Sequence, residues 1–371
     1  GDLYVGTSQD YGAQLDVANA RLNLGGSLVV GRGDGFLGNT ARMTLTNSAV
    51  TAAGFSMGYD NGLAGYFANQ EGTLTDSTLA SNGDTNVAES GGSTATLTLS
   101  GSSAMTSVNR TYIGRNPQST GTLTVEDDSS FTTGGWLGVG GEGAGTLIVR
   151  DNATFTVDGD FNVADIAGGV GTFEMSDNAV VSGTRTYVGK GVGSVGTVTI
   201  NGGTFTGGNA VEFQIGQNGT GTWNQVGGTT NATGWVSIGR YAGSLGTVTV
   251  DGGVLNQVTA DRLLLVGEEG SGGLTINGGQ VNAAAAGGLA VGWGATGYGT
   301  VNLNGGTLVA RQIQAGDGTS EFTFNGGTLK AGANANAAFM TGLGTVTVQA
   351  GGAIIDTNSQ NLTIAQALTD G

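Results

Sequence analysis

The sequence predicts an all-β fold, a single right-handed parallel β-solenoid (β-helix) of about 14 rungs, each with about 25 residues and three short strands. Three observations lead to this prediction. A phrase typified by GTLTV at residues 121–125 recurs through the chain at a near-constant interval. Its residues alternate between apolar and polar. Glycine makes up 75 of the 371 residues and follows the same period. Right-handed winding is expected from the general chirality of parallel crossovers.

The GTLTV phrase is expected to form the first strand of each rung. Its clearest copies lie 24 to 26 residues apart, the length of one solenoid coil. They begin at Gly121, Gly145, Gly171, Gly196, Gly221 and Gly246. Alternation puts Leu123 and Val125 on the inner face of the strand and the threonines beside them on the outer face. The same rule assigns these inward residues: Leu97, Leu99, Leu123, Val125, Leu147, Val149, Phe173, Val198, Ile200, Val248, Val250, Leu274 and Ile276.

A second strand is expected at a phrase that ends in Val-Gly or Ile-Gly, such as LGVG at residues 137–140. After it comes a glycine-rich segment, for example GGEGAG at residues 140–145, where the chain must turn back within a few residues. Glycine supplies the positive φ that such a corner needs. The inward residues of this strand are Ile113, Val139, Val163, Val188, Ile215, Ile238, Val266 and Val291.

A turn of the type Asn-Gly-Gly or Asp-Gly-Gly separates the first strand from a third, very short strand. The turns begin at Asn201, Asp251, Asn277, Asn304 and Asn325. Turn propensity explains these residues, and because they recur at one phase of successive rungs their side chains can also stack into a ladder. The third strand is marked by one apolar residue in each copy: Phe205, Leu255, Val281, Leu308 or Leu329.

One rung cannot bury its own apolar face. Stacked rungs, paired strand on strand at about 4.8 Å, form a continuous core. We therefore expect one continuous β-solenoid domain over residues 1–371. Residues 1–71 are its divergent rungs, 72–343 its regular repeats and 344–371 its last rung.

The composition excludes several kinds of function. The chain has no histidine and no cysteine, which rules out histidine-dependent catalysis, thiol chemistry, disulfides and the metal sites built from these residues. Its 12 basic and 28 acidic residues give a net charge of −16, which repels a nucleic-acid backbone. We expect no nucleic-acid partner, no metal and no cofactor.

The sequence also bears on location. No run of 18 or more apolar residues occurs, so we expect no insertion of this segment into a membrane. The chain begins at Gly1 without a basic and apolar leader, and we expect any export signal to have been removed or to lie outside it. An acidic chain without cysteine suits export.

The complete unit, GTLTV followed by GGxF and LxVGxxxxGxG, resembles the repeat of bacterial autotransporter (type V secretion) passengers and of PEP-CTERM-type surface proteins. Residues 325–368 are similar to the autotransporter-associated β-strand repeat. The resemblance covers nearly the whole chain and implies a right-handed β-helix at the bacterial cell surface or secreted from it. It carries over no catalytic residue. It also leads us to expect that Gly371 is a cut or processed end, before a membrane-anchoring part.

One candidate for surface contact is the tripeptide of Arg32, Gly33 and Asp34, which has the sequence that integrins recognise. It falls in a loop after a second strand and is expected to be exposed. Basic residues occur at the equivalent position of other rungs, as at Arg115 and Arg240. Arg32 is therefore also explained as a recurring residue of the repeat, without a role in binding.

Four aromatic residues are a second candidate. Trp136 and Trp235 precede equivalent second strands, and Tyr112 and Tyr187 lie within such strands. Alternation points all four outward. Exposed aromatic rings can stack on sugars or pack against a neighbour.

The leading hypothesis is a non-enzymatic extracellular rod that serves display, adhesion or matrix, with surface glycans or a neighbouring cell as partners. One alternative is a filament subunit that stacks end to end with other copies through uncapped rungs. Another is a polysaccharide-processing β-helix enzyme. The acidic residues fall in turns of different rungs, for example at residues 126–128 and 268–269, which disfavours paired-carboxylate chemistry.

Overall fold

The computed structural model describes residues 1–6, 12–33, 40–60, 69–209, 211–260, 262–284 and 287–371. Every regular element among these residues is a β-strand, so the described chain has no helix that could cross a membrane. The strands form parallel ladders with three strands in each turn, and the predicted β-solenoid is confirmed. Among the described residues, two of the three strands of a turn occur 15 times and the third occurs 14 times, close to the predicted 14 rungs.

The turns divide into two compact units, Gly1–Thr184 (unit 1) and Arg185–Gly371 (unit 2). The single continuous domain expected for residues 1–371 stays a prediction.

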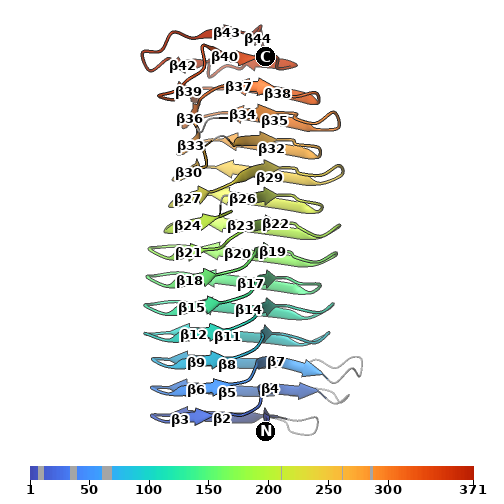
Figure 1. The fold of residues 1–371 in the computed structure, drawn as a ribbon, viewed down its shortest axis with the longest axis vertical. Helices are drawn as coiled ribbons and strands as arrows, with labels where there is room; N and C mark the ends of the chain where they lie inside the picture. Colours follow the sequence, from blue (N-terminus) through green and yellow to red (C-terminus); the bar gives the residue numbers. More distant parts are fainter. Residues whose placement is uncertain (7–11, 34–39, 61–68, 210, 261, 285–286) are drawn as a thin grey trace. The chain divides into compact units, whose positions relative to one another are not determined.

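Unit 1 contains three parallel sheets, and successive turns contribute successive strands to each (Figure 1). Sheet A1 contains β1 (Leu3–Val5), β4 (Leu28–Gly33), β7 (Phe55–Asp60), β10 (Thr85–Val87), β13 (Thr111–Ile113), β16 (Leu137–Val139) and β19 (Phe161–Val163). Sheet B1 contains β2 (Ala13–Ala18), β5 (Thr40–Thr46), β8 (Asn69–Thr75), β11 (Thr94–Ser100), β14 (Thr120–Val125), β17 (Ala144–Val149) and β20 (Val170–Met175). Sheet C1 contains β3 (Arg21–Asn23), β6 (Ala49–Ala52), β9 (Thr78–Ser81), β12 (Ala104–Ser107), β15 (Ser130–Thr133), β18 (Thr154–Val157) and β21 (Val180–Ser182).

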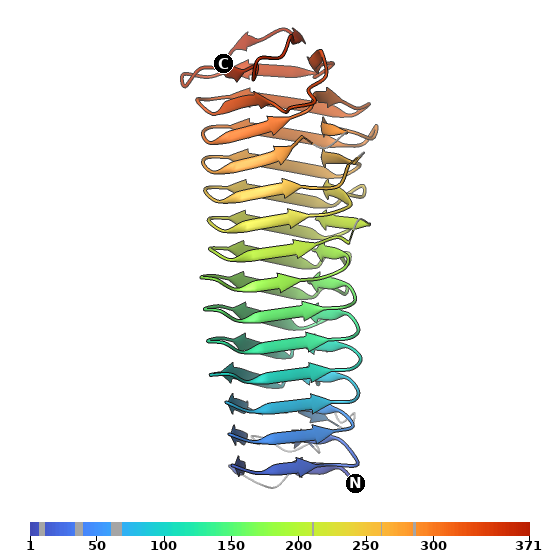
Figure 2. The same ribbon diagram turned by 60° about the vertical axis from the view of Figure 1, so that its left-hand side comes forward.

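Unit 2 is built in the same way, and Figure 2 shows its strands from a second side. Sheet A2 contains β22 (Thr186–Val188), β25 (Glu212–Ile215), β28 (Trp235–Ile238), β31 (Leu263–Val266), β34 (Gly288–Val291), β37 (Ile313–Ala315), β40 (Ala338–Thr341) and β43 (Thr363–Ala365). Sheet B2 contains β23 (Val195–Ile200), β26 (Thr220–Gln225), β29 (Leu245–Val250), β32 (Ser271–Ile276), β35 (Tyr298–Leu303), β38 (Thr319–Phe324), β41 (Thr345–Val348) and β44 (Thr369–Asp370). Sheet C2 contains β24 (Thr204–Gly207), β27 (Thr229–Ala232), β30 (Val254–Gln257), β33 (Gln280–Ala283), β36 (Thr307–Ala310), β39 (Thr328–Ala331) and β42 (Ile354–Asp356).

The inner faces of the three sheets form the core of each unit. Every residue that the sequence assigns to the interior is at most 3% exposed, so the predicted core is confirmed. In unit 1, Phe131 and Phe155 occupy paired positions of β15 and β18, and their ring centroids stack 4.9 Å apart. In unit 2, the ring of Trp223 lies 5.3 Å from that of Phe205 and 5.1 Å from that of Phe213.

The core of unit 2 also contains a polar cluster that the apolar pattern does not predict. Gln225 is fully buried at a position where the paired strands carry Ile200 and Val250. Its side-chain oxygen accepts hydrogen bonds from Trp223 Nε1 at 3.2 Å and from Thr230 Oγ1 at 2.6 Å. These bonds remove most of the cost of burying an amide.

Glycine takes the corner after most A-sheet strands, as expected, whereas Ala88 and Ala164 take it after β10 and β19 with φ of +61° and +63°. At Gly140, φ is +71°, and an added Cβ would lie 2.0 Å from the carbonyl oxygen of Val170 in the next rung. Both the backbone conformation and the close approach of the next rung exclude a larger residue there.

Candidate functional site

The outer face of sheet A1 carries side chains in columns, because equivalent residues of successive rungs are in register. The middle residues of β10, β13 and β16 are Asn86, Tyr112 and Gly138, and they pair directly. Side chains just before and just after these strands form two flanking columns. One flanking column includes Asp84, Arg110 and Trp136, and the other includes Glu89 and Arg115.

The prediction that Tyr112 is exposed is wrong, because this residue is only 6% exposed. Its ring lies against Gly138 of the next rung, where an added Cβ would come within 2.8 Å of two ring atoms. The guanidinium carbon of Arg115 lies 5.2 Å from the ring centroid, and Trp136 Nε1 donates a hydrogen bond to the Tyr112 hydroxyl at 3.0 Å. Arg115 of the same rung and Trp136 of the next rung therefore cover an outward-facing ring.

Trp136 is 38% exposed, in agreement with the expected outward position. One side of its ring is covered by Arg110, whose guanidinium carbon lies 4.7 Å from the ring centroid. Arg110 in turn pairs with Asp84 at 3.6 Å. The tryptophan is thus held by bonds to two residues of the preceding rung.

The aromatic residues predicted in unit 2 are also engaged. The prediction of exposure is wrong for Tyr187, which is 5% exposed: its hydroxyl donates to Glu212, and Lys190 Nζ lies 5.1 Å from its ring centroid. Trp235 is half-buried, with the guanidinium carbon of Arg262 5.6 Å from its ring centroid.

The candidate tripeptide lies only partly within the described residues. Arg32 and Gly33 end β4, whereas Asp34 lies outside the described residues. The guanidinium carbon of Arg32 is 4.6 Å from the ring centroid of Tyr4, so Arg32 packs on a ring as its equivalents do.

The Asn and Asp residues that begin the Asn-Gly-Gly and Asp-Gly-Gly turns form side-chain hydrogen bonds to one another in some of the rungs. Asn277 Nδ2 donates to Asp251 Oδ1 at 2.8 Å, and Asn304 Nδ2 donates to Asn277 Oδ1 at 2.9 Å. Asn325 Oδ1 instead accepts from the backbone N–H of Gly351 at 3.1 Å.

Asn201 is separated from the rest of this ladder. The intervening rung carries Val226 at the equivalent position, since Ile200 and Gln225 pair directly, and a valine side chain has no hydrogen-bonding group.

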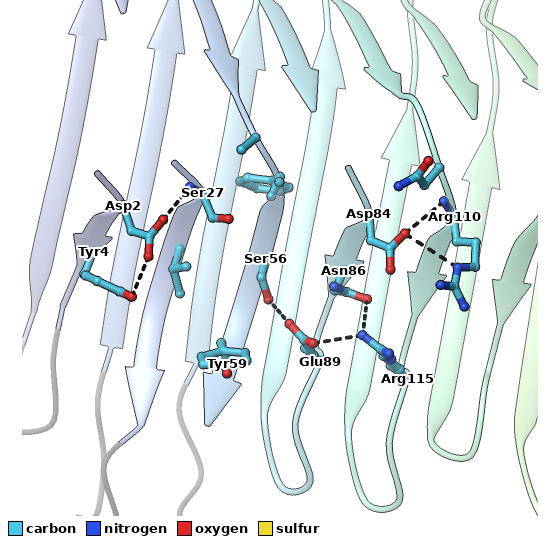
Figure 3. Close-up of a pocket in the computed structure, with 15 residues that line it drawn as sticks. Asp2, Tyr4, Ser27, Ser56, Tyr59, Asp84, Asn86, Glu89, Arg110 and Arg115 are labelled. Atoms are coloured by element: carbon cyan, nitrogen blue, oxygen red, sulfur yellow. Dashed lines mark hydrogen bonds and ion pairs between the residues drawn. The ribbon is translucent and has the colours of Figure 1, made fainter. Parts of the chain in front are cut away.

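The outer face of sheet A1 is hollowed to about 500 Å³ (Figure 3). The hollow exists because small residues of three rungs, among them Ser27, Gly54 and Ser56, line part of it and leave space. Larger side chains at its border are Asp2, Tyr4, Tyr59, Asp84, Asn86, Glu89, Arg110 and Arg115.

The charged groups of this hollow are bonded within the chain. Glu89 pairs with Arg115 at 2.9 Å and accepts a hydrogen bond from the Ser56 hydroxyl. Asp2 accepts from the backbone N–H of Ser27 at 2.8 Å and from the Tyr4 hydroxyl at 3.0 Å. These two bonds lower the pKa of the Asp2 carboxyl below its ordinary value. The dashed lines in Figure 3 follow these contacts.

A second hollow, of about 590 Å³, lies in unit 2 beside the A2 strands. From the sequence we identified Trp235 but not Trp293. We considered residues at the strands and not the residue that follows the corner glycine of each rung, and Trp293 is such a residue. The signal was the phrase VGW at residues 291–293, which places a tryptophan where most other rungs have a charged residue. The lining residues are Trp235, Arg240, Glu268, Glu269, Trp293, Gly294, Ala315, Gly316 and Asp317.

Glu268 is the buried charge of this hollow, at 3% exposure. It forms an ion pair with Arg240 and accepts a hydrogen bond from Trp235 Nε1 at 3.2 Å. Burial raises the pKa of the Glu268 carboxyl, and the contacts with Ser237, Arg240 and Trp235 oppose that rise.

The chain matches no protein-family model, no curated protein and no solved structure. Within the described residues, no group of three or more Asp or Glu side chains is arranged to hold a metal ion. The resemblance to autotransporter passengers and PEP-CTERM-type proteins stays a prediction.

Proposed function

We propose that the chain is a non-enzymatic structural solenoid of a bacterial surface or secreted protein, which displays or spaces other parts and supports adhesion. The proposal agrees with the acidic, cysteine-free composition and with the resemblance of the repeats to surface proteins.

The observation that carries the proposal is that side chains of one rung bond to the equivalent side chains of the next. Arg115 pairs with Glu89 in unit 1, and Asn304 and Asn277 continue a ladder that begins at Asp251 in unit 2. Together with the backbone ladders of three sheets in each unit, these bonds tie successive rungs of a unit to one another. Such a chain resists local opening without disulfides, which suits a mechanical role.

A rung deletion tests this role. Removing residues 121–144 joins Thr120 to Gly145, which is the register partner of Gly121, and so removes one whole turn. A structural solenoid should fold with one turn fewer and still support attachment of the cells that carry it. Removing only residues 121–132 is the matched control, since it shifts every later strand to the wrong sheet and should abolish folding.

The measurements are the circular dichroism and thermal melting of both variants, antibody labelling of intact cells, and attachment of those cells to a surface. If the chain is absent from the surface of intact cells, or if the folded whole-rung variant no longer supports attachment, the proposal is wrong. Release of new reducing ends from an acidic polysaccharide by the purified chain would favour the enzyme alternative.

A further inference from the structure

Six aromatic rings at the surface of the two units are each covered by a cation of the chain itself. The distance from the cationic group to the ring centroid is 4.6 to 5.6 Å in these pairs. The pairs are Tyr4 with Arg32, Tyr112 with Arg115 and Trp136 with Arg110 in unit 1, and Tyr187 with Lys190, Trp235 with Arg262 and Tyr241 with Arg240 in unit 2. Five of the six cations are arginines, whose planar group stacks well on a ring.

Like Tyr298 on β35, Trp293 is an exposed aromatic residue outside this set of six. Its side chain is 38% exposed, and no cation among the described residues lies over its ring. In the column of residues that follow the corner glycine, Trp293 lies between Glu268 of the preceding rung and Asp317 of the following rung. Its backbone N–H donates to the carbonyl of Gly267, and its carbonyl accepts from the backbone N–H of Asp317. A large apolar ring therefore stands between two acidic residues.

Space for a ligand exists beside this ring. Gly294, Ala315 and Gly316 line the same hollow and have no side-chain atom beyond Cβ. The hollow of about 590 Å³ is large enough for one long side chain and the backbone that carries it.

The charge of the hollow selects the ligand. Arg240 supplies one positive charge, and its ion pair with Glu268 neutralises it. The carboxylates of Glu269 and Asp317 are exposed, and neither forms an ion pair within the described part of the chain. These two groups attract a cation and repel an anionic ligand, and the net charge of −16 acts in the same direction.

We infer that this hollow binds a basic polypeptide segment of a partner protein, which places an arginine side chain over the Trp293 ring beside Glu269 and Asp317. The partner's guanidinium takes the place that the chain's own arginines take on five of the six covered rings. The attraction between a cation and an aromatic ring is stronger where water is excluded. The inference goes beyond the proposed structural role, which needs no such site.

The test is a titration of the whole chain into a fluorescein-labelled peptide of alternating glycine and arginine, followed by fluorescence anisotropy at low salt. Trp293→Ala should weaken binding by about threefold or more, as expected for the loss of a cation–ring contact. Trp136→Ala is the matched control, because that residue has the same exposure and the substitution leaves the net charge unchanged. It should leave the affinity within about twofold.

Two further measurements complete the test. The double variant Glu269→Gln with Asp317→Asn should weaken binding and reduce its salt dependence, and a peptide with citrulline in place of arginine should not bind. Equal effects of Trp293→Ala and Trp136→Ala would overturn the inference in favour of diffuse attraction to an acidic chain. Binding of a neutral oligosaccharide that depends on Trp293, without binding of the peptide, would overturn it in favour of a glycan site.

Discussion

Trp136 in unit 1 and Trp293 in unit 2 have the same exposed fraction, 38%, but their surroundings differ. Trp136 donates a hydrogen bond to Tyr112 and lies against Arg110. Trp293 has neither a covering cation nor a side-chain hydrogen bond among the described residues. Two residues with equal exposure therefore have different roles. Trp136 holds adjacent rungs together, whereas the ring of Trp293 is open to a ligand.

The difference comes from the residues one rung away. Trp136 follows a rung that offers Arg110 and Tyr112, whereas Trp293 stands between rungs that offer Glu268 and Asp317. In a solenoid, a side chain contacts residues that lie about 25 positions away in the sequence. The role of an exposed residue therefore depends on the equivalent residues of the adjacent rungs more than on its neighbours in the sequence.

The largest effect in this comparison is expected for the tryptophan of the core. Trp223→Ala should lower the free energy of unfolding by about 3–5 kcal/mol, because it opens a cavity beside Phe205 and Phe213. It also removes the hydrogen bond that Trp223 donates to the buried amide of Gln225. Denaturant unfolding measures the loss, and Trp223→Phe should cost less. A loss below about 1 kcal/mol would mean that this ring is not part of a packed core.

A smaller effect is expected where the ring of Tyr112 uses the space above Gly138. Gly138→Ala places a Cβ within 2.8 Å of two ring atoms, and overpacking of this kind costs about 1–3 kcal/mol. Gly273→Ala in β32 is the control, since its Cβ would meet only Thr300 Oγ1 at an ordinary 3.5 Å. The free energies of unfolding should therefore differ between the two variants, and equal values would contradict the packing of Tyr112 on Gly138.

The comparison also shows what the sequence can and cannot predict. Period-two alternation predicts which residues face inward, as at Leu123 and Val139, because the apolar interior demands it at every rung. The burial of Tyr112 could not be predicted in the same way. It depends on the absence of a side chain at Gly138 and on the hydrogen bond from Trp136, and both of these residues belong to the next rung.

The smallest effect concerns the acid beside Trp293. The pKa of Glu268 is raised in the folded chain above its ordinary value of 4.5, so the folded chain binds this proton more tightly than the unfolded chain. The contribution of Glu268 to stability therefore falls as the pH rises from below 4.5 through the raised folded pKa. Glu268→Gln cannot titrate. We compare the free energy of unfolding of the native chain with that of this variant at each pH. The difference, native minus variant, should fall as the pH rises from below 4.5 through the raised pKa of Glu268. A rise over this pH range would contradict the burial of Glu268.

The most direct test of the difference between the two exposed tryptophans is denaturant unfolding of Trp136→Ala and Trp293→Ala under the same conditions. Trp136→Ala loses a hydrogen bond and a cation–ring contact, and its free energy of unfolding should fall by about 1–2 kcal/mol. Trp293→Ala should stay within about 0.5 kcal/mol of the native chain, because its ring stabilises no other rung. Equal losses in the two variants would show that Trp293 is as much a part of the folded surface as Trp136.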